Sequence, residues 1–322
     1  YSMKKKLLVL AVATALPLGA AQADVTIYGK IHGSIDYIDA DNRKDEYWDV
    51  TSRASRIGFK GSEDLGNGLK LIWKLENGID ITNSDNGGGS LSSRNRYIGL
   101  AGGWGTFLYG THDTPMKMST GKLDLFSDQL ADYNATAGFI DLRAKDAIAY
   151  ISPSWAGLTL AGAIIPDGDY DATGDLAGGY SIAAMYTLNS IFLAAAYEDV
   201  GDLLGDIDNQ DHWRLGAGWD IGNFFIGGVW EQEDRDDDDV DKWQISGSYT
   251  FGNNVIKAMY ADNDWDNDDD IFDDNDGESW AVGWDYNFSK RSQVYIQYAD
   301  SDVNLQDTNA TGEQKGFSMG MI

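Results

Sequence analysis

The apolar residues of this chain recur with a period of two, and this period constrains the fold more than any other feature. In residues 25–37 the odd positions are apolar or glycine, and the even positions are mostly polar. The same alternation recurs in 69–77 and in 292–300. Successive side chains of a β-strand point to opposite faces. Each of these segments therefore predicts a strand with one apolar face.

Short and long connections alternate between the predicted strands. The short ones, such as 65–68 and 251–254, carry the Gly and Asn that hairpin turns require. Counting the segments between connections predicts sixteen strands. Strands of about 10 residues with short turns at one end and long loops at the other are typical of a transmembrane β-barrel. The predicted fold is all-β, a sixteen-stranded antiparallel barrel. A soluble β-sandwich is the alternative, but it rarely needs so many strands in one sheet.

The first residues have the three parts of a secretory signal peptide. Lysines at 4–6 precede the apolar run Leu7–Leu18, and the A-x-A pattern Ala21–Ala23 precedes Asp24. We therefore expect residues 1–23, which include two residues before Met3, to be a signal peptide and 24–322 to form the barrel. The alternative is a membrane anchor, but the run is too short to cross about 30 Å of hydrocarbon as a helix.

Composition narrows the function. The chain has 24 basic and 52 acidic residues, and without the three lysines of the signal peptide 21 bases would face 52 acids, a formal charge of −31. Such a surface repels nucleic acid, whose phosphates need Lys and Arg. Cysteine is absent, which excludes disulfides and thiolate metal sites. His32, His112 and His212 form no ligand-spaced motif, so we predict no catalytic residue, no metal site and no cofactor.

Acid-rich loops leave one alternative open. Asp262, Asp264 and Asp266 have the spacing of an EF-hand, but Asn267 stands where that loop needs glycine and Asp273 closes it. We interpret these acids as solvated loop tips, with weak binding of divalent cations as the alternative.

Three stretches resemble the general trimeric porins of Gram-negative bacteria, the Gram-negative porin family. They are 55–70, 95–110 and 147–153, the first reading Ser-Arg-Ile-Gly-Phe-Lys-Gly-Ser-Glu-Asp-Leu-Gly-Asn-Gly-Leu-Lys. The resemblance implies a sixteen-stranded barrel in the outer membrane, in contact with lipid and lipopolysaccharide, and a homotrimer. It also implies a third extracellular loop folded into the pore, and passive diffusion of small hydrophilic solutes and ions rather than catalysis.

The chain departs from the family at its end. Members usually finish on an aromatic residue, whereas this sequence stops at 316–322 with Met321 and Ile322. We therefore expect the last strand to be short, as though truncated.

Strand alternation selects basic residues for the pore wall. Placing Ile57 against lipid turns Arg56 inward, and placing Tyr97 outward turns Arg96 inward. A base facing lipid at mid-membrane costs about 2–4 kcal/mol, although some long side chains reach an interface instead. The predicted pore-lining bases are Lys30, Arg56, Lys60, Arg94, Arg96, Arg143 and Lys145.

The connection 112–141 is long for a hairpin, and such length is usually functional. It spaces Asp124, Asp128 and Asp132 at i, i+4 and i+8, which would share one face of a helical turn. By resemblance, this loop narrows the pore and holds its acids opposite the wall bases. Acids that lie near the wall arginines are expected to have depressed pKa values and to stay ionised. The alternative is a solvated helix on an outer loop.

These observations predict an outer-membrane porin. Two other classes remain as alternatives. One is a barrel hydrolase, which would need a Ser-His-Asp type constellation at the rim. The other is a structural or adhesive barrel that uses its acidic loops to bridge calcium.

Overall fold

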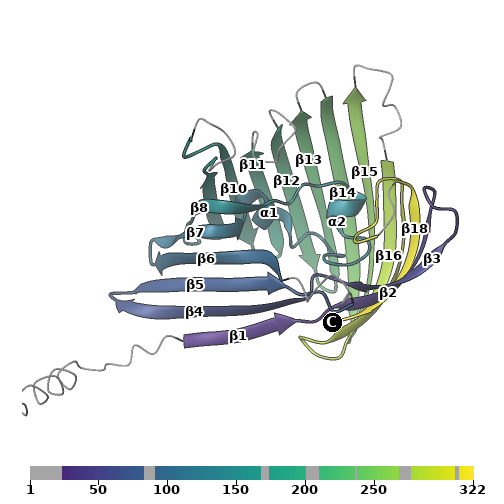
Figure 1. Cartoon of the computed structure of the whole chain (residues 1–322), viewed down its shortest axis with the longest axis horizontal. Helices are drawn as coiled ribbons and strands as arrows, with labels where there is room; N and C mark the ends of the chain where they lie inside the picture. Colours follow the sequence, from purple (N-terminus) through teal and green to yellow (C-terminus); the bar gives the residue numbers. More distant parts are fainter. Residues whose placement is uncertain are drawn as a thin grey trace, which may run out of the picture.

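A computed structural model describes residues 24–82, 91–167, 174–200, 210–235, 238–267, 277–308 and 312–322. The predicted signal peptide, 1–23, lies outside the described residues. The described part contains one antiparallel sheet of eighteen strands and two short helices (Figure 1). The elements are β1 (Asp24–Lys30), β2 (Gly33–Ala40), β3 (Tyr47–Ser52), β4 (Arg56–Gly66), β5 (Leu69–Gly78), β6 (Ser92–Gly102), β7 (Gly105–Asp113), α1 (Pro115–Thr120), α2 (Tyr133–Thr136), β8 (Arg143–Ile151), β9 (Leu158–Ile165), β10 (Gly179–Leu188), β11 (Ile191–Asp199), β12 (Gln210–Ile221), β13 (Phe224–Arg235), β14 (Asp238–Phe251), β15 (Asn254–Asn267), β16 (Gly277–Asn287), β17 (Gln293–Ser301) and β18 (Gln314–Met321).

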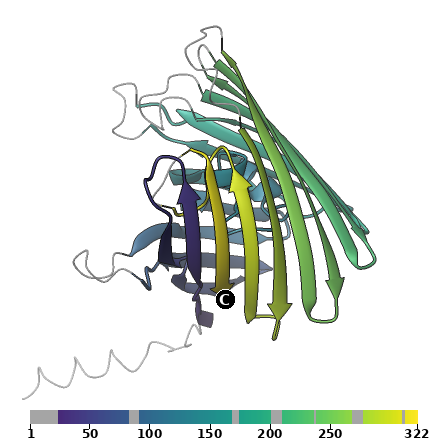
Figure 2. The same ribbon diagram turned by 90° about the vertical axis from the view of Figure 1, so that its right-hand side faces the viewer.

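The strand pairing follows the chain. From β4 to β18 each strand pairs antiparallel with the next. In addition, β2 pairs with both β3 and β18, and β1 pairs with β4. Figure 2 shows β2 and β3 beside the yellow β18, although these strands lie at opposite ends of the sequence. The all-β antiparallel fold predicted from the sequence is confirmed.

The count of eighteen differs from the sixteen predicted because two predicted strands are each interrupted. One break falls between β1 and β2, and the other between β3 and β4. The breaks face each other: the Arg53 amide donates to the His32 carbonyl at 2.8 Å, and the Ser55 hydroxyl donates to the same carbonyl at 2.9 Å. A side chain therefore replaces part of the backbone ladder at this point.

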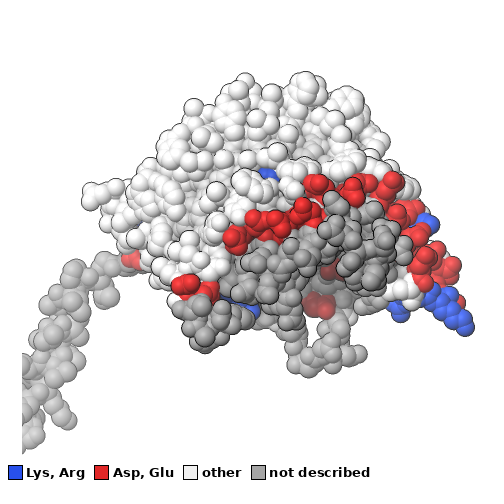
Figure 3. Space-filling view, turned by 90° about the horizontal axis from the view of Figure 1, so that it is seen from above, with Lys and Arg blue, Asp and Glu red and all other residues white. Residues whose placement is uncertain are grey.

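The two faces of the sheet differ in polarity. In β12, Trp213 and Leu215 are 54% and 51% exposed, whereas His212 and Arg214 are fully buried. The convex face thus carries large apolar side chains while polar groups lie inside, the reverse of a soluble protein and as expected for strands in lipid. Figure 3 shows Asp and Glu gathered in a band on one face of the molecule, beside wall surface that carries almost no charge.

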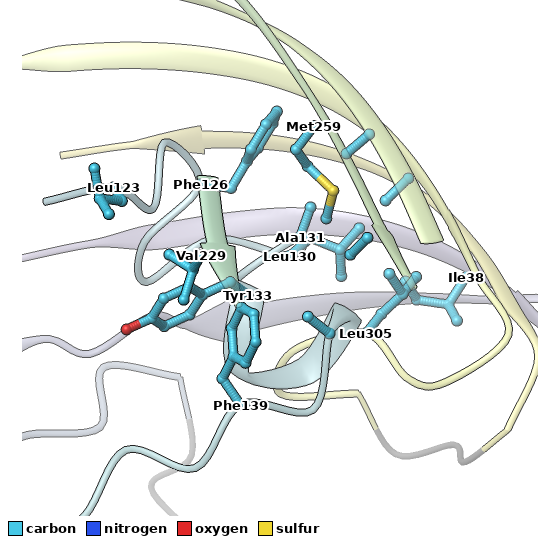
Figure 4. Packing of buried hydrophobic residues seen from close by; sticks show 14 of the residues in the cluster. Ile38, Leu123, Phe126, Leu130, Ala131, Tyr133, Phe139, Val229, Met259 and Leu305 are labelled. Atoms are coloured by element: carbon cyan, nitrogen blue, oxygen red, sulfur yellow. The ribbon is translucent and has the colours of Figure 1, made fainter. Parts of the chain in front are cut away.

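The connection between β7 and β8, residues 114–142, lies against the concave face of the sheet, and we call it the inner loop. Its apolar residues Leu123, Phe126 and Tyr133 pack with Val229 of β13 and Met259 of β15, two strands of the sheet that forms the wall (Figure 4). Each such side chain contributes roughly 1.5–3 kcal/mol when fully buried. The main hydrophobic cluster is therefore the contact between this loop and the wall.

The inner loop begins with a capped helix. Thr114 accepts a hydrogen bond from the Lys117 amide, and Pro115 occupies the first turn of α1, where its missing N–H costs nothing. Neither helix of the described chain is long and apolar enough to cross a membrane.

Candidate functional site

Four side chains of the wall bind carbonyl oxygens of the inner loop, and we call them the anchor residues. Arg214 donates to the Ile140 carbonyl at 2.7 Å, and Lys242 donates to that of Gly138 at 2.8 Å. Lys257 donates to the carbonyl of Leu125 at 2.9 Å, and Ser246 donates to the carbonyl of Leu123 at 3.1 Å. Because these carbonyls belong to irregular backbone, the anchors supply hydrogen bonds that a helix or sheet would otherwise provide.

The basic wall comprises Lys30, Arg56, Lys60, Lys74 and Arg94, on β1, β4, β5 and β6. Glu76 joins two of its members: Arg94 Nε lies 2.9 Å from Oε1, and Lys74 Nζ lies 3.1 Å from Oε2. The ammonium groups of Lys60 and Lys74 lie 5.4 and 5.8 Å from the centre of one ring, that of Tyr28. The five bases therefore gather on the inner face.

Asp128 of the inner loop meets this wall directly. Its Oδ2 lies 2.8 Å from Lys30 Nζ and 3.6 Å from Arg56 Nη1. Burial raises the pKa of this carboxyl, but the charges of Lys30, Arg56 and Arg94 outweigh burial and hold the pKa below its usual value. Asp128 thus stays ionised, with the depressed pKa expected from the sequence.

The arrangement of Asp124 and Asp132 differs from the predicted helical turn. They do not share a helical face with Asp128, because residues 121–132 form turns between α1 and α2. Asp124 accepts from the Phe126 amide at 2.9 Å, and Asp132 accepts from the amides of Asp128 at 2.7 Å and Asn134 at 3.0 Å. Such local bonds compete with helix formation.

The pKa values of these two acids are raised, unlike that of Asp128. Burial raises the pKa of Asp124 well above its usual value, and the neighbouring Asp132 adds to this. Burial, with the charges of Asp128 and Asp141, raises the pKa of Asp132 to about 7 despite its two amide hydrogen bonds. Depressed values were expected only for acids near the wall arginines, and no ion pair joins Asp124 or Asp132 to an arginine of the wall within the described residues.

Two of the predicted bases lie beyond the basic wall. Arg143 Nε lies 2.9 Å from Asp113 Oδ1 and donates to Asn95 Oδ1 at 3.0 Å. Lys145 is exposed beside a shift in the β7–β8 register, and no ion pair involves it within the described ranges. The structure therefore joins Arg143, but not Lys145, to the polar interior.

Arg96 lies on the other face. Tyr97 faces inward, since its ring contacts that of His112 at 5.2 Å between centroids, so the outward placement predicted for it was wrong. Arg96 pairs with Leu75 in the register and has the parity of Ile98, which is 38% exposed. A shift in the β5–β6 register separates Arg96 from Arg94.

A polar cavity of ≈430 Å³ lies between the inner loop and the basic wall. Its lining includes Arg94, Lys117, Asp128, Asp132 and Asp141. Fixed charges of both signs around a narrow polar space create a transverse field that orients dipolar solutes and sorts ions by sign. This cavity is the candidate functional site.

The anchor residues and Lys74 were not among the residues predicted from the sequence to be functional. The signal for them was present, since Arg214 stands between Trp213 and Leu215, and Lys242 precedes Trp243. The alternation that selected Arg56 applies equally to these strands. The acids at 262–266 were expected in a loop but fall within strand β15, and Asp273 lies outside the described residues.

Comparison with known sequences gives a consistent result. The family model for the Gram-negative porin matches residues 7–306. The major outer membrane protein P.IB of Neisseria gonorrhoeae is 29% identical over 258 residues, 72% of each chain. The protein of the same name from Neisseria meningitidis is 38% identical over 165 residues, about half of each chain (49% and 48%).

Solved structures share the fold. The anion-selective porin from Comamonas acidovorans has a TM-score of 0.79 at 21% identity, covering 93% of this chain and 99% of its own. OmpF of Salmonella typhi has a TM-score of 0.72 at 16% identity, with coverages of 94% and 99%. OmpT of Vibrio cholerae, solved in a trimer form, has a TM-score of 0.65 at 15% identity and coverages of 93% and 98%.

Proposed function

Because this chain belongs to the Gram-negative porin family and is an outer-membrane porin, we propose that solutes cross it between the inner loop and the basic wall. The observation that carries the proposal is the contact of Asp128 with Lys30 and Arg56, which sets an acid of the loop against bases of the wall. Small hydrophilic solutes and ions diffuse passively through the channel, and its selectivity is set at this constriction.

We further propose that the porin is a closed barrel of sixteen membrane-crossing strands. Counting β1 with β2, and β3 with β4, as single strands with a break reduces eighteen to sixteen. The pairing of β18 with β2 supports closure, because it joins the last strand to the first. A closed barrel leaves no open sheet edge in lipid.

The assembly that we propose is a homotrimer in the outer membrane, in contact with lipid and lipopolysaccharide. The trimer form of the Vibrio cholerae OmpT, which shares the fold, supports this. The apolar outer face, with residues such as Ile27 and Trp48 at 69% and 66% exposure, offers surface for both lipid and neighbouring subunits.

Neutralising the constriction should shift ion selectivity in opposite directions. We expect Arg56→Ser to favour cations and Asp128→Asn to favour anions. Two unit charges 4 Å apart interact by about 1 kcal/mol in water and more where water is excluded, so each change should alter the permeability ratio by about three- to fivefold. Reversal potentials of single channels in a salt gradient measure this ratio.

The matched control is Asp239→Asn, which removes an exposed acid near the start of β14. At 1 M salt the screening length is only about 3 Å, so an exposed charge far from the constriction should contribute little. A larger shift for Asp239→Asn than for Arg56→Ser at 1 M salt would refute a constriction at Asp128.

The selectivity should also depend on pH near neutrality. Since the pKa of Asp132 is raised to about 7, acidification from pH 8 to pH 6 protonates this carboxyl and removes a negative charge from the cavity. We expect the preference for anions to rise as the pH falls through this window. Asp132→Asn should abolish the step. A step of unchanged size in Asp132→Asn would assign the titration to another group.

A further inference from the structure

Three titratable side chains form a row across the inner face of β11, β12 and β13. His212 pairs in register with Glu198 on one side and with Glu233 on the other. Directly paired residues of an antiparallel sheet hold their Cβ atoms about 4.5–5.5 Å apart. Glu231 lies two residues from Glu233 on the same face, and all four side chains are fully buried, at 0% exposure.

The imidazole of His212 lacks a hydrogen-bonding partner in this row. Neither Nδ1 nor Nε2 bonds to any group of the described chain, although both are buried. One ring nitrogen of His212 and one carboxylate oxygen each of Glu231 and Glu233 all lie within 4.8 Å of one another. Buried polar atoms normally have partners, so the ring is free to bind a ligand between the two carboxylates.

The charges around the row do not balance. Three buried or nearly buried carboxylates, those of Asp141, Glu231 and Glu233, form ion pairs with the two cations Arg214 and Lys242. With a neutral histidine the formal sum of these groups is −1. Uncompensated negative charge is costly in a buried setting, and a bound cation would offset it.

We propose that His212, Glu231 and Glu233 bind a divalent transition-metal ion of the zinc type. An imidazole nitrogen with two carboxylate oxygens suits Zn²⁺, which commonly takes three protein ligands and one water. This site goes beyond the proposed function, because it lies behind the inner loop and not in the polar cavity. Lys242 competes with the metal, since it contacts both Glu231 and Glu233.

Equilibrium dialysis of the folded, detergent-solubilised porin against Zn²⁺ tests the proposal, with excess Ca²⁺ present to saturate the exposed acids. We expect one tightly bound Zn²⁺ per chain in the wild type. His212→Gln should weaken that binding by more than about 100-fold, since even partners outside the ligand set of a metal site are worth 10–100-fold. Lys242→Met should strengthen it, because it removes the competing cation.

The matched control is His112→Gln, which removes a histidine outside the row and should keep the bound ion. Because His212→Gln could impair folding, anomalous diffraction at the zinc edge from wild-type crystals soaked in Zn²⁺ provides an independent readout. A peak among the side chains of His212, Glu231 and Glu233 supports the site. Three results would overturn the proposal: the absence of a zinc peak at this place, the absence of a tightly bound Zn²⁺ in the wild type, or an equal loss of Zn²⁺ binding in the His112 and His212 variants.

Discussion

Replacing Arg214 with alanine is expected to lower the free energy of unfolding by about 3–5 kcal/mol, because removing one partner leaves buried carboxylates uncompensated. Arg214 is fully buried, lies 2.6 Å from Asp141 and pairs with Glu231, which is also fully buried. It further donates to the carbonyl of Ile140. The substitution should therefore also loosen one end of the inner loop, raising single-channel conductance and its fluctuations.

The measurements are urea unfolding of the protein in lipid vesicles, followed by tryptophan fluorescence, and single-channel recording. The control is Lys315→Ala, whose exposed side chain pairs with the equally exposed Glu313 at 3.2 Å. Exposed pairs of this kind contribute little, so this variant should unfold like the wild type. If both variants had the same unfolding midpoint, Arg214 would not hold the inner loop in place.

Alternation alone predicted which face of most strands lies inside. It placed Lys30 and Arg56 on the pore wall, and the long connection suggested an acid opposite them. The structure brings Asp128 into contact with both bases, across 98 residues of sequence from Lys30. Alternation could place these two bases on one face because the side-chain period of a strand is fixed by its backbone and needs no knowledge of the neighbouring strands.

Side-chain alternation gives the wrong face where the pairing register of two strands shifts. Between Leu75 and Asn77 the β5–β6 register changes, so Arg94 and Arg96 are no longer equivalent despite their spacing of two. A one-residue slip moves every later side chain to the opposite face. No residue type in 92–96 marks this shift, which is why the sequence assigned Tyr97 to the wrong side.

Side chains that become neighbours only through strand pairing also cannot be recognised from the sequence alone. His212 and Glu233 lie 21 positions apart, a spacing that resembles no ligand motif, yet the β12–β13 ladder pairs them directly. The helical spacing of Asp124, Asp128 and Asp132 is the opposite case. It suggested a shared face, but side-chain bonds from Asp124 and Asp132 to nearby amides favour turns instead.

Replacing Ile296 with arginine is expected to destabilise the barrel by about 2–4 kcal/mol, the cost of a base on the lipid face near mid-membrane. Ile296 lies in the central part of β17 and is 40% exposed on the apolar face. Its register partners Trp284 and Met319 are apolar, so no neighbouring group compensates the new charge. The yield of heat-modifiable folded protein and its urea midpoint measure the effect.

The next residue, Gln297, provides the matched control because it faces the other way. Gln297 is 2% exposed and lies on the inner face. Its side-chain amide makes no hydrogen bond within the described chain. Gln297→Ala therefore removes a buried polar group without breaking a bond, and it should fold with a yield and midpoint close to the wild type. If Ile296→Arg folded with the same yield and midpoint as Gln297→Ala, Ile296 would not face lipid and the inward and outward assignments of β17 would be wrong. The position of the apolar band would then have to be redrawn.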